Sequence, residues 1–536
     1  MHGTRPKFKV SSVTSRRLLA VTTALTLSVI AFAVALPPEA PSASDANASL
    51  WPTRSLDGTG NHPDDIGAAG SAFRRMSQSR TETARSRPDP RVISETLHAY
   101  PEGVWTQPDP RNRSLLFAAF GQFLSHDISL RAKSRRPEFV SVGHDDSMFP
   151  AGAILPFAPN APHPETGEPY NRVTSWIDGS MIYGSDPCRA AALRRFDGGE
   201  LRMGRADHLP RYGENLEGAR SEEPLSGFDG CPDRFENENP RRDPATEFFV
   251  AGDTRANENP VLLSLHTIFA REHNRRARRL SAIHPEWDDE LLYNEARRWV
   301  GALVQAVTYY EYLPTLLGES PLPAYEGYSP SQAADVSLEF AAGAFRFGHS
   351  QMGPTLFRAA PNGERFKFSD VSLKACYFAT PVYEQAGGGP GTWLTGASQF
   401  RAEPVDLAII DDLRNYMFGD LNGGLDVATI NIAVGRDSAL GTFNDIRASV
   451  GLPPKHTFNN LSSDTQVVEK LSRLYGAVEH VDPWVAMLAE ARASGDRSVD
   501  GETLRAVIAE QFSRLRDGDR FYFENDPALG ERSTLP

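Results

Sequence analysis

The chain has 536 residues, of which 40% are apolar, so it is long enough to bury a large core. Its formal net charge is −13, and acidic and basic residues are mixed along it, which argues against nucleic acid as the main partner. Three cysteines are too few for a disulfide framework, so stability has to come from the core and from ligands.

The N-terminal region differs from the rest of the chain. Basic residues precede an uncharged apolar run over residues 18–36, and small residues, Pro and Ser follow it. This pattern is typical of an export signal, for which we expect cleavage, although the run is also long enough for an uncleaved anchor. We therefore predict an export signal or N-terminal anchor over 1–42, a linker over 43–55 and one domain over 56–536. The predicted location is extracellular or periplasmic.

The first long helix is predicted over residues 113–127, where apolar residues dominate and neither Pro nor a β-branched residue interrupts them. Gln122 and His126 lie four residues apart on one face, and Asp127 lies about a hundred degrees further round. A helix this apolar is buried, and its polar side chains then need partners. Taken alone, such a histidine is more often a satisfied core residue than a catalytic one.

A Pro-rich loop is predicted over residues 149–169, and a candidate calcium loop follows it. Thr174, Asp178 and Ser180 would point the same way from an extended segment, and their oxygen atoms suit Ca²⁺. One carboxylate makes a weak site, and a second one from Asp127 would make it credible. The alternative is an ordinary hydroxyl-rich turn.

Residues 201–247 are polar and rich in Pro and Gly, which predicts a long surface excursion. Cys188 and Cys231 bracket part of this stretch and could pair, which would leave Cys376 over. Arg255 and Glu258 precede a helix predicted over 261–280, where they could simply form an ion pair. His266 and His273 on that helix are interpreted as packing residues and not as zinc ligands.

Two more helices are predicted over 288–317 and 338–349. Small residues in the second helix would let a large flat group lie close to it, and His349 shares a face with Arg346. Two histidines on two buried helices, His126 and His349, are what a haem site needs. Asn431 begins another apolar helix and could hold the far nitrogen of a ligating histidine. The remainder is helical with few strands, so the fold class is mainly α.

These motifs resemble those of the animal-type haem peroxidases (the peroxidase–cyclooxygenase superfamily), in a form similar to bacterial and peroxinectin-like members. The resemblance runs from about residue 56 to residue 523. It rests on six motifs in family order: Gln122 to Asp127, Thr174 to Ser180, Gly252 to Glu258, Arg271 to Asn274, Phe345 to His349 and Asp517 to Phe521. The resemblance implies a single large domain with very little β structure and a haem held between helices.

The resemblance also implies roles for individual residues. His126 corresponds to the distal general base and acid, Gln122 orients peroxide or halide, and Arg255 stabilises charge as the O–O bond breaks. His349 corresponds to the iron ligand, with Asn431 as its neutral hydrogen-bond acceptor.

The implied cofactors are haem b and Ca²⁺. Calcium would be held by Asp127, Thr174, Asp178, Ser180 and the backbone carbonyl of Trp176. Ser125 stands where some relatives have an ester-forming Asp, while Glu258 is retained, so we expect at most one ester link to haem. Fewer links imply a lower redox potential. The expected donors are therefore bromide, iodide, thiocyanate or phenols, with H₂O₂ as oxidant and no stable protein partner.

Two other functions are open at this point. A fatty-acid dioxygenase of the same superfamily would use a Tyr radical three residues before the proximal histidine, a position that Arg346 occupies here. A non-catalytic adhesion protein that binds haem and calcium would leave Gln122, His126 and Arg255 without a use.

Overall fold

The computed structural model describes residues 52–78, 87–211, 236–240, 248–319, 321–367, 369–384, 389–420, 423–490, 501–527 and 529. The predicted export segment and the central part of the predicted surface excursion, including Cys231, lie outside the described residues. Within these ranges, none of the helices combines the length and the apolar character needed to cross a bilayer.

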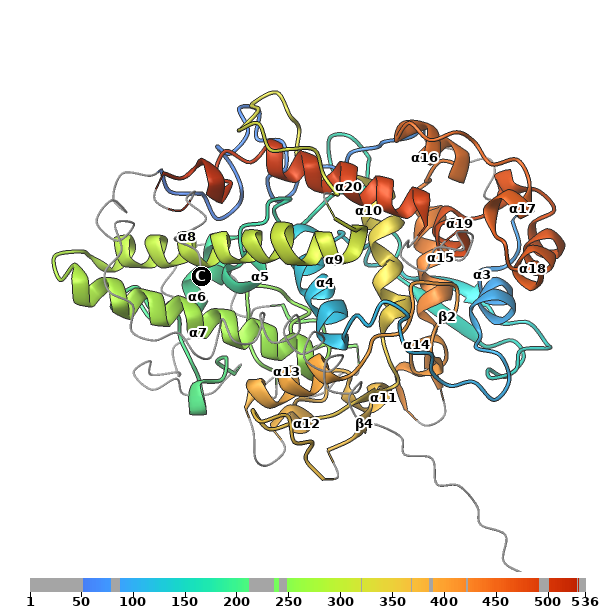
Figure 1. Ribbon diagram of the computed structural model, residues 1–536, viewed down its shortest axis with the longest axis horizontal. Coiled ribbons are helices and arrows are strands. Elements are labelled where there is room, and N and C mark those ends of the chain that lie inside the picture. Colours follow the sequence, from blue (N-terminus) through green and yellow to red (C-terminus); the bar gives the residue numbers. More distant parts are fainter. Residues whose placement is uncertain are drawn as a thin grey trace, which may run out of the picture.

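The fold is mainly helical, as predicted. Its first long helix, α4 (Leu115–Ile128), begins at Ser114, whose side chain accepts a hydrogen bond from the Phe117 backbone N–H. It packs against α5 (Ser180–Tyr183), α7 (Pro260–Ile283), α13 (Pro390–Gln399) and the 3₁₀ helix η7 (Ala344–Gln351). Figure 1 shows α4 near the centre of the molecule and two long helices, α7 and α8 (Asp289–Val307), side by side.

The other helical segments surround this centre. They are α3 (Pro90–Ile93), the π turn η3 (Ser94–His98), α6 (Pro187–Leu193), η4 (Arg205–Asp207), the π turn η6 (Thr308–Tyr312), α9 (Leu313–Leu317), α10 (Leu338–Ala341), α11 (Leu373–Cys376), α12 (Thr380–Glu384), α14 (Asp411–Arg414), α15 (Val427–Asp437), α16 (Phe443–Ser449), α17 (Phe458–Leu461), α18 (Thr465–Tyr475), η8 (Val478–His480), α19 (Pro483–Glu490), α20 (Glu502–Asp517) and η9 (Phe523–Asn525). One continuous hydrophobic core runs through them.

The two helices predicted over 288–317 and 338–349 are each interrupted. The first changes from α8 to the π turn η6 and then to α9. The second breaks after α10 at Gly343, whose φ of −126° and ψ of −95° are not helical, and resumes as the 3₁₀ helix η7. A side chain at Gly343 would meet the carbonyl oxygen of Glu339 at 2.5 Å, so this close turn needs glycine.

The described strands form three two-stranded antiparallel sheets. They pair β1 (Glu138–Ser141) with β2 (Ile154–Phe157), β3 (Thr355–Leu356) with β4 (Val371–Ser372), and β5 (Met417–Asp420) with β6 (Gly423–Leu425). In the first sheet, Phe139 is opposite Pro156 and Val140 is opposite Leu155. Val140 and Leu155 pack against Ala433 of α15 in a small separate core. The stretch predicted as a Pro-rich loop therefore contains a strand.

Candidate active site

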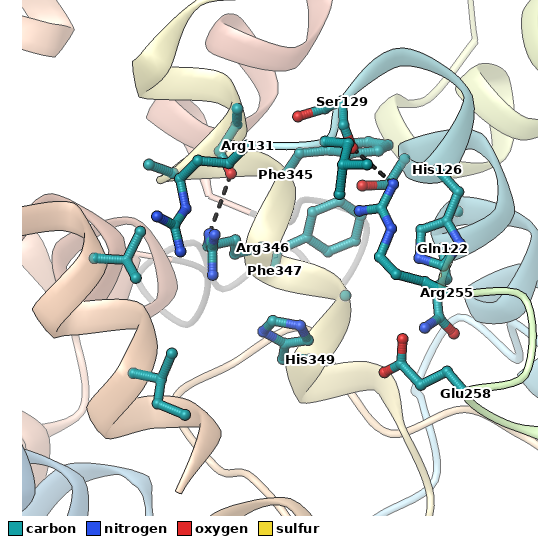
Figure 2. A pocket seen from close by; sticks show the side chains of 18 of the residues that line it. Gln122, His126, Ser129, Arg131, Arg255, Glu258, Phe345, Arg346, Phe347 and His349 are labelled. Atoms are coloured by element: carbon teal, nitrogen blue, oxygen red, sulfur yellow. Dashed lines mark hydrogen bonds between the residues drawn. The ribbon is translucent and has the colours of Figure 1, made fainter. Parts of the chain in front are cut away.

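A cavity of about 300 Å³ lies where α4, the segment before α7, η7 and α15 meet. Six of the predicted site residues line it: Gln122, His126, Arg255, Glu258, Arg346 and His349. Figure 2 shows Gln122, His126 and Arg255 on one side of the cavity, across from His349. Ala341, Ala342 and Gly348 also line the cavity, and these small side chains leave room within it.

His126 is 4% exposed, and no hydrogen bond to its Nδ1 is present among the described residues. The nearest carboxylate oxygen is Oδ1 of Asp253, at 3.5 Å. Burial holds the pKa of His126 well below its ordinary value, and the positive charge of Arg255 lowers it further against the opposing effect of Asp253. The imidazole is therefore neutral at physiological pH and able to accept a proton.

Arg255 is held by Asp253 through two hydrogen bonds. Its Nε donates to Oδ1 at 2.9 Å and its Nη2 to Oδ2 at 2.7 Å, while Nη2 also donates to the backbone carbonyl of Ser129 at 2.9 Å. Burial would raise the pKa of Asp253, but Arg255 outweighs it, so that the pKa lies well below the ordinary value. The sequence left open an ion pair between Arg255 and Glu258. Among the described residues, Arg255 forms its ion pair with Asp253 instead.

Gln122 and Asn259 are linked across the cavity wall. The Nδ2 group of Asn259 donates to Oε1 of Gln122 at 3.1 Å, which leaves the amide nitrogen of Gln122 available to the cavity. Asn259 also caps α7, because its side chain accepts from the Leu262 backbone N–H at 2.9 Å. Ser125, one residue before His126 on α4, also lines the cavity.

Glu258 shares the cavity with a second acidic residue, Glu238. Burial and then the negative charge of Glu238 raise the pKa of Glu258 to about 7. Glu238 itself accepts a hydrogen bond from Lys133 at 2.5 Å, and both of these residues line the cavity. At neutral pH the Glu258 carboxyl is thus a mixture of protonated and ionised forms.

His349 and Asn431 are in contact through the amide nitrogen of Asn431. Nδ2 of Asn431 lies 2.8 Å from Nδ1 of His349, while Oδ1 of Asn431 accepts a hydrogen bond from Nη1 of Arg346 at 2.7 Å. Arg346 thus occupies the carbonyl oxygen of Asn431 in this structure, and the acceptor role of Asn431 toward an iron-bound His349 stays a prediction. Burial and the charge of Arg346 lower the pKa of His349 to about 3, so the imidazole is neutral.

The predicted calcium residues lie together, although the segment is a series of bends and not an extended strand. Oγ1 of Thr174 donates to Asp178 at 3.1 Å, and Oγ of Ser180 donates to the backbone carbonyl of Asp127 at 2.6 Å. Oδ1 of Asp127 is buried without a hydrogen-bond partner among the described residues. Burial raises the pKa of Asp127 well above its ordinary value, and the negative charge of Asp178 adds to this effect.

The residues that were interpreted as structural make ordinary contacts. Nδ1 of His266 lies 3.1 Å from the Met181 carbonyl, and His273 lies between the Tyr183 hydroxyl and the Gly199 carbonyl.

The cysteines differ in state. Cys188 is disulfide-bonded, and its predicted partner Cys231 lies outside the described residues. Cys376 is a buried free thiol.

Sequence reasoning missed the roles of Asp253, which binds the cavity residue Arg255, and of Arg131. Asp253 was noted only as part of a motif, although its position two residues before Arg255 was a signal that the arginine could be paired locally. Arg131 lines the cavity from the loop after α4, and no pattern in the sequence distinguishes it from the neighbouring surface basic residues.

Known proteins with similar sequences match most of the chain. The chain is 33% identical to Peroxinectin A of Dictyostelium discoideum over 428 residues, which is 76% of each chain. It is 33% identical to lactoperoxidase of Mesocricetus auratus over 484 residues, which is 83% of this chain and 66% of the relative. The chain spans 34% of the matched peroxidasin of Drosophila melanogaster.

Solved structures with the same fold also cover most of the chain. Peroxidase A from Dictyostelium discoideum superimposes with a TM-score of 0.78 at 30% identity, covering 89% of this chain and 93% of that one. A fatty acid alpha-dioxygenase from Oryza sativa superimposes with a TM-score of 0.71 at 20% identity, covering 94% and 85%, which shows a shared fold. The family model described as animal haem peroxidase matches residues 53–532. The chain therefore belongs to the animal haem peroxidase family.

Proposed function

We propose that this protein is an exported haem peroxidase that uses H₂O₂ to oxidise a halide, thiocyanate or a phenol. The observation that carries the proposal is one cavity with a neutral His126 and a fixed Arg255 on one side and a neutral His349 on the other. The N-terminal apolar run supports export.

The residues of the cavity fit a haem. His349 is neutral and lines the cavity, and its Nδ1 is already in contact with Asn431, so Nε2 is the nitrogen left for iron. A neutral imidazole that binds through Nε2 carries its proton on Nδ1, so iron binding would favour the amide orientation with the Asn431 carbonyl toward His349. When bound, the haem iron would supply the redox chemistry that cleaves the O–O bond.

The residues opposite His349 would handle the proton and the developing charge. His126 accepts a proton from H₂O₂ and returns it to the departing oxygen atom, which leaves as water. Arg255, held by Asp253, stabilises the negative charge on that oxygen while the bond lengthens. Gln122 offers its amide nitrogen to orient peroxide or a halide.

The residues around Asp127 fit a calcium ion. Two buried carboxylates, Asp127 and Asp178, repel each other, and a buried oxygen of Asp127 lacks a partner among the described residues. No group of three or more His, Cys, Asp or Glu side chains converges there in the described part of the chain. Calcium would therefore depend on hydroxyl and carbonyl oxygens as well, from Thr174, Ser180 and Trp176.

Glu258 supports at most one ester link to haem, because Ser125 has no carboxyl group. We expect Glu258→Gln to leave the haem fully extractable in acidic solvent, while the wild type retains a covalently bound fraction after treatment with H₂O₂. Mass spectrometry of the extracted haem and of the protein measures this. Unmodified, fully extractable haem from the wild type would contradict the link.

Stopped-flow absorption of the haem-loaded protein tests the proposed function. We expect the Soret band to change rapidly on mixing with H₂O₂ and to return when iodide, bromide, thiocyanate or a phenol is added. His126→Ala should slow the first step about 10²- to 10⁴-fold without loss of haem, because that is the usual contribution of a general acid–base group.

His144→Ala removes an exposed histidine and serves as the control for this experiment. A Soret band that does not respond to H₂O₂ in the wild type would overturn the proposal. Consumption of linoleate and O₂ without H₂O₂ would favour the dioxygenase instead.

A further inference from the structure

Aromatic rings form a continuous series of contacts from the cavity to the π turn η6. Phe340 and Phe345 line the cavity, and their rings stack with centroids 4.5 Å apart. Each of them contacts Phe512 of α20 with a centroid distance of 5.7 Å. Phe512 in turn contacts Tyr309 of η6 at 6.4 Å, and its backbone carbonyl accepts a hydrogen bond from the Tyr309 hydroxyl at 3.1 Å. One ring, that of Phe512, therefore separates Tyr309 from the rings that line the cavity.

The series of rings continues from Tyr309 to the molecular surface. The ring of Tyr309 contacts that of Tyr522 edge to face at 5.3 Å, and Tyr522 contacts Phe523 at 4.8 Å. Phe523 then contacts Tyr310 at 5.5 Å. Tyr310 is 38% exposed, whereas Tyr309 and Tyr522 are buried. The contacts thus lead from a buried cavity to a ring that a large molecule outside the protein can touch.

The hydroxyl groups of these tyrosines differ in their acceptors. Tyrosine gives up its phenolic proton when it is oxidised by one electron, so a stable radical needs a base nearby. Tyr309 donates to a backbone carbonyl, which does not take up the proton. Tyr310 and Tyr522 both donate to Oε1 of the Glu524 carboxylate, at 2.5 and 3.3 Å. The short hydrogen bond to a carboxylate makes Tyr310 the tyrosine of this series on which a radical is best stabilised.

The buried tyrosines are protonated before any oxidation. Burial raises the pKa of both Tyr309 and Tyr522 well above the ordinary value. Oxidation of either ring therefore has to release a proton inside the protein, which favours passage of the radical onward to Tyr310 and Glu524.

We propose that Tyr310 is a second donor site, at which phenols too large for the cavity are oxidised by electron transfer along these rings. The proposal rests on the proposed peroxidase activity, because the electron acceptor is the haem that H₂O₂ has oxidised. Tyr310 gives one electron to the haem along the rings and its phenolic proton to Glu524, which releases it to solvent. The neutral tyrosyl radical then takes one hydrogen atom from the phenol, which leaves as a phenoxyl radical. Two such cycles supply two electrons, which with two protons from solvent convert one H₂O₂ to two water molecules.

Trapping of the radical tests the site in the absence of a donor. Full-length haem-loaded protein is mixed with H₂O₂ and a nitroso spin trap, and mass spectrometry of its peptides locates the labelled residue. Electron paramagnetic resonance of protein made with ring-deuterated tyrosine identifies the radical as tyrosyl, because deuteration narrows its signal. We expect the label on Tyr310 and its loss from this position in Tyr310→Phe, which keeps the ring and removes the hydroxyl.

Two donors of different size test what the radical does. Free tyramine is a small phenol, whereas tyramine bound to dextran by a short amide linker is too large for a cavity of about 300 Å³. Tyr310→Phe should lose most of its kcat/KM for the dextran-bound phenol and keep that for free tyramine. Glu524→Gln should have the same effect, because an amide oxygen still accepts the hydrogen bond of Tyr310 but does not take up its proton.

Tyr170→Phe is the matched control. Tyr170 is a half-buried tyrosine whose ring contacts that of His163 at 5.8 Å, and it does not line the cavity. Its replacement should change neither the label on Tyr310 nor the kcat/KM for either donor.

A wild type that oxidises free tyramine but carries no label on Tyr310 would overturn the second donor site and leave the peroxidase proposal intact. Equal kcat/KM values of wild type and Tyr310→Phe for the dextran-bound phenol would overturn it as well, because the radical would then not serve a donor. Failure of the peroxidase proposal looks different: the Soret band of the wild type would not respond to H₂O₂, free tyramine would not be oxidised, and the second donor site would fail with it.

Discussion

At the residue scale, Asp253 determines the position of Arg255. Its carboxylate accepts two hydrogen bonds from the guanidinium group and lies 3.5 Å from His126. Asp253→Asn would place an amide N–H group against the guanidinium group and remove the charge. We expect the second-order rate constant for H₂O₂ to fall roughly 10- to 100-fold, because charge-assisted hydrogen bonds contribute about 1.5–3 kcal/mol.

The rate of the later reaction with the donor separates this effect from general damage. It should stay within about twofold of wild type, because Arg255 is proposed to act while the O–O bond breaks. Glu236→Gln, which breaks a 2.7 Å ion pair with Arg172 outside the cavity, is the control and should change neither rate. Equal losses in both steps would contradict a positioning role for Asp253.

The sequence predicted the cavity-lining residues better than their contacts. Gln122 and His126 are on one face of α4 because they are four residues apart, and both line the cavity as helical geometry requires. The orientation of Asn431 could not be predicted, because it depends on Arg346, whose position is set by the break at Gly343. Contacts of this kind depend on tertiary structure and not on spacing.

At the scale of the elements, Gly121 allows α4 to approach the π turn η6. A Cβ atom at Gly121 would lie 2.4 Å from the Tyr312 hydroxyl oxygen. Gly121→Ala should therefore destabilise the protein by about 1–3 kcal/mol through overpacking, although alanine favours a helix. Thermal unfolding followed by circular dichroism measures the change.

A second helical glycine provides the comparison. A Cβ atom at Gly435 of α15 would meet only Cδ1 of Leu440 at 3.6 Å and the Ala342 carbonyl at 3.8 Å, which are ordinary contacts. Gly435→Ala should leave the melting temperature unchanged or raise it, because alanine reduces the conformational entropy of the unfolded chain. If both variants behaved alike, close packing at Gly121 would not be the cause.

The sequence predicted whole helices well and their interruptions poorly. Apolar periodicity places α4 and α7 within a few residues of their observed bounds. It does not register the π turn η6, because five residues are too few to distinguish one helical period from another. Strand β2 was missed because Ile154–Phe157 contains Pro156 and lies in a Pro-rich stretch.

At the scale of the whole molecule, the proposed calcium site joins distant segments. Asp127 directly follows His126, and Ser180 donates to its backbone carbonyl. Gly252, one residue before Asp253, packs so closely on this loop that a Cβ atom would lie 2.3 Å from the Ser180 carbonyl oxygen. A change in the loop would therefore reach both His126 and the pair of Asp253 and Arg255.

Removal of calcium should depend on pH. Burial raises the pKa of both Asp127 and Asp178. Without a cation, the folded protein is therefore most stable, as far as these two groups are concerned, below their ordinary pKa of 3.8, where both are protonated. That stability is lost as pH rises through the raised pKa values and the buried carboxyls ionise. Bound calcium offsets this loss, because it favours the ionised carboxylates. We therefore expect calcium to raise the melting temperature more at pH 8 than at pH 5.

The same removal should also affect the active site. A chelator at pH 8 should lower the melting temperature and slow the reaction with H₂O₂. Added Ca²⁺, but not Mg²⁺, should restore both, because Ca²⁺ accepts an irregular set of protein oxygens, whereas Mg²⁺ demands octahedral geometry and loses its water reluctantly. At saturation 100-fold above Kd, the stabilisation should be about 3 kcal/mol. Asp178→Asn should resemble the chelated protein and respond little to Ca²⁺. A melting temperature and a peroxide rate that do not change with the chelator would show that Asp127 and Asp178 hold no calcium, and His126 would then depend on the packing of α4 alone.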